Sequence, residues 1–407
     1  MSGSLVLKNL IQDCRKLKKS FGFQYICNEE ILTKALNKLN LPAKYPKPNS
    51  TKILEIYPGP AIQSLITYNI LKPKQYILLE KHTYFHNLIT KHILLNNEYT
   101  TSIKPTFTGL ESIAKIYTSK DTKNYPNLQL TDLNPYNWES YSHITNFNVK
   151  TSKTEDPEHA IFLPSTQSFD KVHEEFLILG NLTGNVTATA TGEALYMQLL
   201  SCITRQNWLQ RFGRVRMVFW VSEATARKLV TFPGDKARSK ASLLSETFTE
   251  TKVVALSNSA QINPDVNKPC SASMFNKRVI DRDDPYFYDA KNMDLIEPIN
   301  GAVLKKCGLP VLIEISPKYN TGEIWDTWDY VTKHLLVLKT RPLGESLNSL
   351  GPGAFEYFNR VIQDKSLLEK PSNTLTKEDF IYLTDIFYNW PFKPDIMMDF
   401  VDVLQDD

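Results

Sequence analysis

The sequence contains no uninterrupted run of about 18 apolar residues, the length that a membrane-spanning helix needs. We therefore expect no transmembrane helix and no membrane partner. The five cysteines are scattered and form no C-x-x-C pair, which argues against a disulfide framework or a zinc site and favours reduced thiols inside a cell. The chain also lacks a P-loop and a G-x-S-x-G motif, so neither nucleotide hydrolysis nor serine-based hydrolysis is indicated.

Metal ligands and targeting signals are sparse as well. His82 and His86 lie four residues apart but have no third ligand nearby, so we expect a surface helix and no metal site. The N-terminus has no apolar segment of the kind that a secretory signal requires. Residues 4–19 mix leucines with basic residues as a mitochondrial address does, although Asp13 departs from that pattern. This segment alone leaves the compartment open.

Charge is nearly balanced overall, at a net +3, but basic residues are concentrated in one part of the chain. Between residues 205 and 240 there are nine basic residues against two acidic ones. Such a run is typical of a phosphate-binding surface, and a solvated face without a ligand would give the same pattern. The basic residues are Arg205, Arg211, Arg214, Arg216, Arg227, Lys228, Lys236, Arg238 and Lys240. After residue 394 the chain is acidic, with five aspartates and no basic residue.

Short apolar runs alternate with helix-compatible segments, which predicts an α/β fold with a mostly parallel sheet and helices on both faces. The strand-like runs are Ile53–Ile56, Tyr76–Leu79, Phe176–Leu179, Val215–Val221, Lys252–Leu256 and Val311–Ile315. Polar segments near 96–127, 142–158 and 257–273 are predicted to be surface insertions. We place a domain boundary near residue 320: residues 1–320 form the α/β domain, and 321–407 form a small helical domain with an acidic tail.

The loop after the first predicted strand is the most informative motif. An apolar run ends at Glu55, and a Pro-Gly turn then leads into a helix-compatible segment. Methyltransferases that use S-adenosylmethionine have E-x-G-x-G-x-G here, because glycines let the backbone approach the cofactor. In this chain Tyr57 and Ala61 replace two of those glycines and only Gly59 remains. The loop resembles that of a methyltransferase, with an aromatic ring near the space of the methionine moiety.

Two polar residues at strand ends extend this resemblance. Glu80 ends the second strand, where an acid typically accepts hydrogen bonds from ribose hydroxyls, although capping of the next helix would explain it equally. Asn181 follows the fourth strand, where adenine-N6 methyltransferases have N-x-P-aromatic. This chain keeps the asparagine but has Thr183 and Gly184 in place of the proline and the ring, which would otherwise stack on a flipped base.

The segment from Val221 to Gly234 resembles the ribosomal RNA adenine dimethyltransferases, whose fifth strand and helix read Q-x-E-V-A-x-R-L before a P-G pair. The matching residues are Glu223, Ala226, Arg227, Leu229, Pro233 and Gly234. Lys19–Ile26 likewise resembles the family's opening K-x-L-G-Q-H-F-L, with Phe23 replacing the glutamine that contacts the cofactor. The family's G-D-A-L acid would fall at Asp132 or, in the register we favour, at Asn134 before Pro135.

The resemblance assigns seven positions to an altered S-adenosylmethionine pocket, so we expect a Rossmann-like methyltransferase fold without methyl-transfer activity and without a required cofactor. These positions are Ile26, Glu55, Tyr57, Gly59, Glu80, Asn134 and Asn181. Within the superfamily the chain resembles the mitochondrial transcription factors B of budding yeasts. The shared segments are Ser20–Phe23, Leu54–Gly59, Leu78–Lys81, Asn134–Trp138, Trp328–Thr332 and Asn389–Asp395.

Members of that branch are initiation partners of a phage-like, single-subunit RNA polymerase, and they help to melt the promoter. The resemblance therefore implies a monomer in the mitochondrial matrix and nucleoid, bound to the polymerase and to promoter DNA, including the melted strand. We assign phosphate contacts to the basic run (Arg216 excepted). Tyr136, Trp138 and Trp208 are candidates for stacking on unpaired bases. Two alternatives stay open: an active ribosomal RNA adenine dimethyltransferase, and an assembly factor of mitochondrial ribosomes.

Overall fold

The computed structural model divides the chain into two compact units. The first consists of Met1–Ala226, Lys252–Ser259 and Asp283–Lys318, and the second of Arg227–Thr251, Ala260–Arg282 and Tyr319–Asp407. The structure describes residues 3–17, 19–20, 22–47, 49–103, 114–120, 123–148, 153–154, 157, 160–184, 191–298, 308–319 and 325–396.

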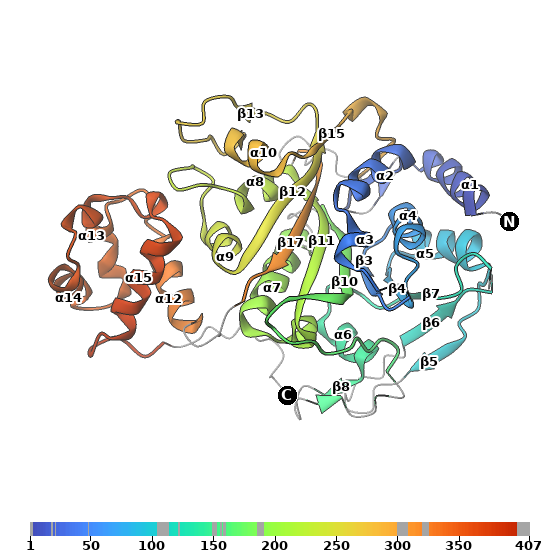
Figure 1. Ribbon diagram of the computed structural model, residues 1–407, viewed down its shortest axis with the longest axis horizontal. Coiled ribbons are helices and arrows are strands. Elements are labelled where there is room, and N and C mark those ends of the chain that lie inside the picture. Colours follow the sequence, from blue (N-terminus) through green and yellow to red (C-terminus); the bar gives the residue numbers. More distant parts are fainter. Residues whose placement is uncertain are drawn as a thin grey trace. The chain divides into compact units, whose positions relative to one another are not determined.

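The first unit is built on a ten-stranded sheet (Figure 1). Across the sheet the order is β15 (Tyr286–Tyr288), β12 (Thr249–Ser257), β17 (Pro310–Pro317), β11 (Arg214–Ser222), β10 (Val172–Leu182), β3 (Lys52–Ile56), β4 (Gln75–Leu79), β7 (Leu128–Thr131), β6 (Ala114–Thr118) and β5 (Thr101–Ile103). The pairs from β11 through β10, β3 and β4 to β7 are parallel, whereas β17 runs antiparallel to β11. This confirms the predicted Rossmann-like α/β class.

The chain leaves β3 for β4 on one side, whereas β10 connects to β11 on the other side. In open α/β sheets such a reversal of strand order opens a crevice at the carboxyl ends of the strands, where ligands bind. Since crossover connections between parallel strands are right-handed as a rule, the helix after β3 and the helix after β10 are expected on opposite faces. The central strands are apolar and buried along most of their length, as expected for a sheet covered on both sides.

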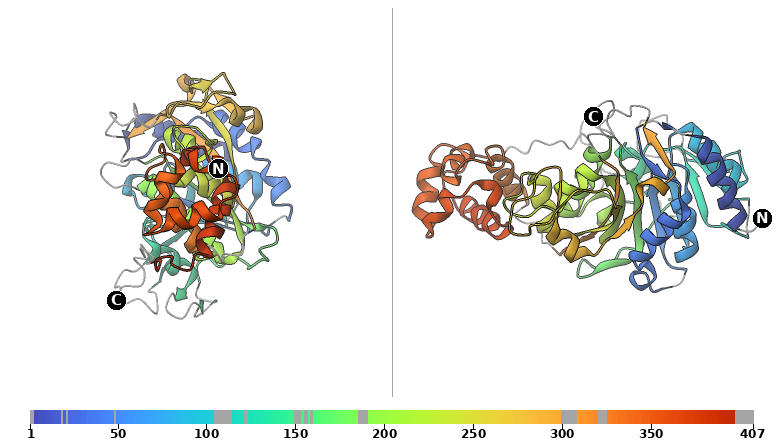
Figure 2. Two further views of the ribbon diagram at one scale, coloured as in Figure 1. Left: turned by 90° about the vertical axis from the view of Figure 1, so that its left-hand side faces the viewer. Right: turned by 90° about the horizontal axis from the view of Figure 1, so that it is seen from above.

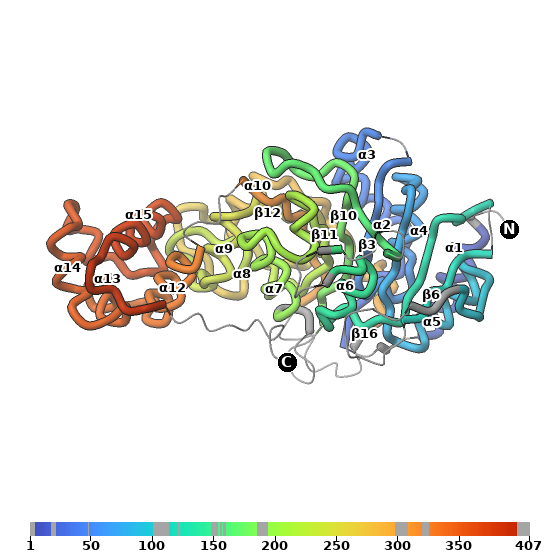
Figure 3. Tube along the Cα trace, turned by 90° about the horizontal axis from the view of Figure 1, so that it is seen from below, coloured from blue at the N-terminus to red at the C-terminus, as the bar shows by residue number. Residues whose placement is uncertain are grey.

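Helices of the first unit form two layers. On one face α1, α2 and α3 pack on α4, and on the other α7 packs on β10 and β11 (Figures 1 and 3). The helices are α1 (Gly3–Lys16), α2 (Glu29–Lys38), α3 (Leu41–Lys44), α4 (Ile62–Leu71), α5 (Thr83–Ile89), the π-helix η1 (Thr90–Leu94), α6 (Trp138–Thr145), α7 (Thr191–Arg205), and the 3₁₀ helices η3 (Trp208–Phe212) and η4 (Ala290–Asn292). The helix α8 (Glu223–Leu229) runs from the first unit into the second.

Short strands complete the first unit. β1 (Lys19–Ser20) and β2 (Tyr25–Ile26) both pair with β16 (Leu295–Pro298), which fixes the N-terminal segment beside the crevice. The insertion expected near 96–127 contributes β5 and β6 to the sheet edge, with residues 104–113 and 121–122 outside the described part. The insertion expected near 142–158 includes the end of α6 and the pair β8 (Phe147–Asn148) and β9 (Lys153–Thr154).

The second unit joins three segments of the chain. Its elements are α9 (Lys240–Phe248), β13 (Ile262–Asn263), β14 (Phe275–Asn276), α10 (Lys277–Asp283), α12 (Trp325–Leu335), α13 (Leu343–Ser346), η5 (Leu347–Leu350), α14 (Ala354–Val361), η6 (Lys365–Glu369), η7 (Ser372–Thr374) and α15 (Lys377–Tyr388). Helices α12 to α15 gather in one bundle (Figure 2). The boundary expected near residue 320 marks the start of the last segment; 227–251 and 260–282, expected in the α/β domain, belong to the second unit instead.

Aromatic packing ties α9 to α12 within this unit. The ring of Phe248 lies 5.4 Å from Trp325 and 5.1 Å from Trp328, measured between centroids. Trp328 is only 1% exposed. Helix α15 begins at a capping box formed by Thr376 and Asp379. Of the acidic tail, residues 397–407 lie outside the described part of the chain.

Candidate nucleic-acid interface and remnant cofactor crevice

The loop between β3 and α4 has the backbone of a glycine-rich loop but keeps only one of its glycines, Gly59. Tyr57, Gly59 and Ala61 all lie in the left-handed region, with φ of 50°, 58° and 58°. For a residue with a Cβ this conformation costs roughly 1–2 kcal/mol. The methyltransferase-type turn is therefore kept although two of its residues carry side chains that oppose it.

Aromatic rings fill the space in front of this loop. The Phe23 ring lies 4.6 Å from Tyr57 and the Tyr25 ring 5.0 Å from Phe85, measured between centroids. A Cβ added to Gly59 would meet the Tyr25 ring at 2.2 Å, so that ring rests directly on the glycine backbone. We call Phe23, Tyr25, Tyr57 and Phe85 the aromatic plug; of these, Tyr25 and Tyr57 are 5% and 6% exposed.

Glu80, the acid expected to bind ribose hydroxyls, faces the protein backbone. Its Oε2 accepts the N–H of Gly59 at 2.9 Å and its Oε1 accepts the N–H of His82 at 2.8 Å. Burial raises the pKa of Glu80 to about 8, although both N–H donors pull it down. Both carboxylate oxygens are thus used to fix the loop and the start of α5.

Glu55 is likewise enclosed by hydrogen bonds. The Tyr76 hydroxyl donates to its Oε2 at 2.5 Å, and the Gln63 amide donates to its Oε1 at 3.1 Å. The Trp220 indole N–H in turn donates to Gln63 at 2.5 Å. Burial raises the pKa of Glu55. This buried network links β3, β4, α4 and β11 at the crevice.

Asn181 binds the N-terminal segment instead of presenting its amide to the crevice. Its Nδ2 donates to the carbonyl of Gln24 at 2.7 Å, and its Oδ1 accepts the N–H and hydroxyl of Thr183 at 3.0 and 2.6 Å. Thr183 also accepts the N–H of Gln24 at 2.9 Å. The residue that replaces the family's proline therefore helps to hold the plug segment against β10.

Asn134 closes the crevice on the β7 side. Its Oδ1 accepts both the Tyr57 hydroxyl at 3.1 Å and the N–H of Tyr136 at 3.2 Å. Its Nδ2 donates to Asn137 at 3.2 Å. A polar group at this register thus anchors the plug and shapes the loop that leads into α6.

Six of the seven positions assigned to the vestigial pocket lie at or just beyond the carboxyl ends of β3, β4, β7 and β10, and Ile26 of β2 lines the same cavity. The remaining cavity has a volume of about 30 Å³, lined in part by Ile26, Glu55, Tyr57 and Asn181. Such a volume holds a few water molecules, whereas pockets for drug-sized ligands span about 300–1,000 Å³. The side chains as folded therefore do not fit S-adenosylmethionine.

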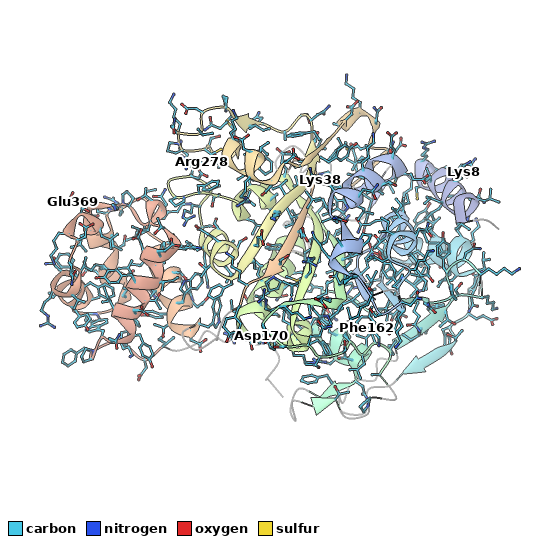
Figure 4. All side chains as sticks on the ribbon, in the orientation of Figure 1. Lys8, Lys38, Phe162, Asp170, Arg278 and Glu369 are labelled. Atoms are coloured by element: carbon cyan, nitrogen blue, oxygen red, sulfur yellow. The ribbon has the colours of Figure 1, made fainter. Side chains whose placement is uncertain are left out.

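Most of the basic residues assigned to phosphate contacts in the first unit are used internally. Arg211 donates to the Thr145 hydroxyl at 2.9 Å, its guanidinium lies 3.6 Å from the centroid of the Phe147 ring, and burial lowers its pKa to about 10. Arg214 donates to the backbone carbonyls of Pro317 and Asp170 at 3.0 and 2.9 Å (Asp170 is labelled in Figure 4). Arg205 is exposed at the end of α7.

The other five belong to the second unit. Arg238 is fully buried; it pairs with Glu246 at 2.8 Å and donates to the carbonyl of Leu375 at 3.1 Å. Its assignment to phosphate binding is wrong, because a residue with no exposed surface cannot reach DNA. Lys240 pairs with Asp329 at 2.5 Å, and Arg227 donates to the carbonyl of Ser273. Lys228 is partly exposed and Lys236 is exposed. Charge counting therefore overstated the phosphate-binding surface.

Comparison with known proteins decides the family. The model of the family described as "Ribosomal RNA adenine dimethylase" matches residues 14–385. This chain belongs to the ribosomal RNA adenine dimethylase family. Two curated relatives are named "Mitochondrial transcription factor 1". The one from Lachancea kluyveri is 37% identical over 397 residues, 97% of each chain, and the one from Saccharomyces cerevisiae is 37% identical over 395 residues, 97% of this chain and 96% of the relative.

These matches confirm the resemblance to the budding-yeast transcription factors that the motifs indicated. Among solved structures, a dimethyladenosine transferase from Plasmodium falciparum gives a TM-score of 0.46 at 13% identity, over 89% of this chain and 96% of that chain. Within the described residues, no group of three or more potential metal ligands occurs. No helix in the described part of the chain is long and apolar enough to cross a membrane.

A pair of tryptophans, both of them candidates for base stacking from the sequence, lies beside the crevice. Trp138 is the first residue of α6, and its ring centroid lies 3.9 Å from that of Trp208, with an interplanar angle of 57°. Tyr141 contacts Trp208 edge-on at 5.8 Å. Both tryptophans are partly exposed. In sequence Trp208 is a lone tryptophan 70 residues beyond Trp138, so no motif joins them.

The backbone of Trp208 is strained. Its φ is +54°, a left-handed value that is an outlier for a bulky residue. Such a conformation costs roughly 1–3 kcal/mol and persists only where the surroundings impose it. Each favourable aromatic contact is worth about 0.5–1.5 kcal/mol beyond the area it buries. The contacts with Trp138 and Tyr141 are therefore of the right size to offset the strain.

Proposed function

We propose that this protein is a mitochondrial transcription initiation factor that helps a single-subunit RNA polymerase to recognise, melt and hold open a promoter. The proposal extends to this chain what the names of two relatives indicate; both relatives are 37% identical to it over nearly its whole length. In this role the protein works in the mitochondrial matrix as a monomer, bound to the polymerase and to DNA.

The observation that carries the proposal is the aromatic plug. Methyl transfer needs room for S-adenosylmethionine and an asparagine that accepts from the target amine. Here Tyr25 lies on the Gly59 backbone, and the Asn181 side chain binds Gln24 and Thr183. A family member in which these groups hold the fold together is suited to binding nucleic acid without modifying it. We accordingly propose that it binds no S-adenosylmethionine and transfers no methyl group.

DNA contact is assigned to the rim beside the plug. Tyr136 and Trp138 are partly exposed where the loop after β7 enters α6. Unpaired bases stack on such aromatic rings whatever the DNA sequence. Arg205 is exposed at the end of α7 and supplies a positive charge for phosphate. We propose that this rim receives the melted strand. Separately, Lys228 and Lys236 of the second unit are proposed to contact phosphate.

Run-off transcription with the cognate mitochondrial RNA polymerase tests the proposal. One template carries a duplex promoter and the other the same promoter with a pre-melted bubble. We expect transcription from the duplex to depend on the protein and the bubble to remove that dependence. No effect on either template would overturn the proposal, and methylation of ribosomal RNA would then be assayed.

The runner-up function is an active adenine dimethyltransferase, since Gly59, Glu80 and Asn181 still occupy family positions. Titration calorimetry with S-adenosylmethionine separates the two. We expect no heat of binding at micromolar protein, because the plug fills the crevice. Binding with a micromolar dissociation constant would favour the enzyme.

A further inference from the structure

The segment between α7 and β11 contains two non-glycine residues with positive φ, Gln206 and Trp208. Gln206 follows the helix end, where the N–H of Asn207 donates to the carbonyl of Cys202 at 3.3 Å. This bond, from the second residue after the cap back into the last turn, is the Schellman motif, in which a left-handed residue ends a helix. Trp208, two residues later, begins η3, where the N–H of Gln210 donates to the carbonyl of Asn207 at 2.9 Å and closes a tight turn around it. This turn and the contacts of its ring together hold Trp208 in the left-handed conformation.

The surroundings of that ring are fixed. Tyr141 is 2% exposed, and its hydroxyl donates to the carbonyl of Pro135 at 2.7 Å, just before the α6 helix. Trp208 contacts this fixed ring and also Trp138, whose own ring lies 6.0 Å from Tyr141. The three rings come from α6 and η3, and the indole of Trp138 lies against the other two. Trp138 is therefore restricted in the orientations it can adopt.

Both tryptophans remain partly exposed, unlike the fully packed core rings Phe162 and Phe176 in the same unit. A ring that served only to fill the core would be covered by its neighbours. An indole that is supported from one side and open on the other is instead suited to accept a planar group on the open side. The strained turn provides that support, because it places Trp208 against Trp138.

We propose that Trp208 is a positioning residue that holds the indole of Trp138 in the orientation in which it stacks on an unpaired base of the melted promoter. This inference rests on the proposed function and adds to it a residue that no motif marks. Arg205 supports this assignment. It is exposed at the end of α7, three residues before Trp208, and supplies a positive charge for the phosphates of the strand that carries the base.

The test uses the full-length protein with polymerase and promoter templates that carry 2-aminopurine in the melted region, on either strand in separate templates. This base fluoresces when it unstacks from its DNA neighbours. Four variants are compared: Trp138→Ala, Trp208→Ala, Trp208→Gly and Trp208→Phe. The matched control is Gln206→Gly, which removes the other left-handed side chain and keeps both indoles.

We expect Trp208→Gly and Trp208→Ala to lower duplex run-off and the wild-type change in 2-aminopurine fluorescence about tenfold, roughly the loss of one stacked base. The pre-melted template should restore run-off to within twofold. Trp208→Phe should keep both signals. Trp138→Ala should reduce run-off and fluorescence change as much as the Trp208 variants do. The double variant with Trp208→Gly should reduce these signals no further, because both changes abolish the same stacking by Trp138.

Stability separates positioning from mere packing. Glycine accepts the left-handed backbone, so Trp208→Gly should unfold at a higher urea concentration than Trp208→Ala and yet show the same loss of fluorescence change. The inference is overturned if Trp208→Gly gives wild-type run-off and fluorescence. It is also overturned if the pre-melted bubble does not restore the lost run-off, or if Gln206→Gly shows the same losses. If wild-type protein itself fails to support duplex transcription, the proposed function fails, and that result is distinct from all of these.

Discussion

Substitution of Gly59 by alanine tests the aromatic plug directly, without any ligand. At φ of +58° the new Cβ costs roughly 1–2 kcal/mol through the backbone alone. That Cβ would also lie 2.2 Å from the Tyr25 ring, and forcing extra carbon into a packed core typically costs a further 1–3 kcal/mol or so. We therefore expect Gly59→Ala to lower the free energy of unfolding by about 2–5 kcal/mol.

The matched control is Gly22→Ala. Gly22 has φ of +83° and nothing within 4 Å of an added Cβ, so only the backbone cost applies. Both glycines lie in the first unit, and urea unfolding followed by circular dichroism reports the same transition for both. In a Tyr25→Val background, Gly59→Ala should cost no more than Gly22→Ala does. Equal losses for the two glycine variants in the wild-type background would refute the packing of Tyr25 on this loop.

Three further outcomes follow from buried groups. Because burial raises the pKa of Glu80 from 4.5 to about 8, the folded state keeps a proton that the unfolded chain loses above pH 4.5, so stability is lost as pH rises towards 8. Between pH 6 and 9 we expect this group to remove about 2–3 kcal/mol, and Glu80→Gln to flatten that slope in urea titrations; an unchanged slope would contradict the assignment. Arg238→Ala removes a buried guanidinium that pairs with Glu246 and donates to the carbonyl of Leu375, and it should destabilise the second unit by roughly 1.5–3 kcal/mol in thermal unfolding. The salt dependence of DNA binding by Arg238→Ala should equal that of wild type, and a shallower salt slope would return Arg238 to the phosphate-binding set.

Much of the fold was predictable because the central strands are apolar and buried. All six strand-like runs, among them Ile53–Ile56 and Val215–Val221, lie in strands of the sheet. The strand β5 at the sheet edge and its neighbour β6 were taken for part of a polar insertion, because their Thr, Ser and Lys residues conceal the alternation of buried Ala114 and Ile116. Edge strands bury one face at most, so their hydrophobic pattern is weaker.

The pocket positions could be located from the sequence because motif residues at strand ends meet at one edge of a parallel sheet. What fills the pocket could be foreseen only in part. The substitutions at Phe23 and Tyr57 were visible, but the contact of Tyr25 with Gly59 depends on how the N-terminal segment pairs with β16. Likewise, no charge count shows that Arg238 is buried against Glu246. Contacts between distant segments decide these roles.

The second unit has a consequence for how the protein can be cut and how it folds. Helix α9 packs through Phe248 on tryptophans of α12, more than 75 residues later, and Arg238 bonds to the carbonyl of Leu375. A fragment that stops at residue 319 therefore exposes apolar surface of α9 and removes the Leu375 carbonyl to which Arg238 donates. During synthesis, the apolar face of α9 likewise stays without its packing partner until α12 has been made. Chaperone dependence and protease sensitivity should thus be greatest in chains that lack the final 90 or so residues.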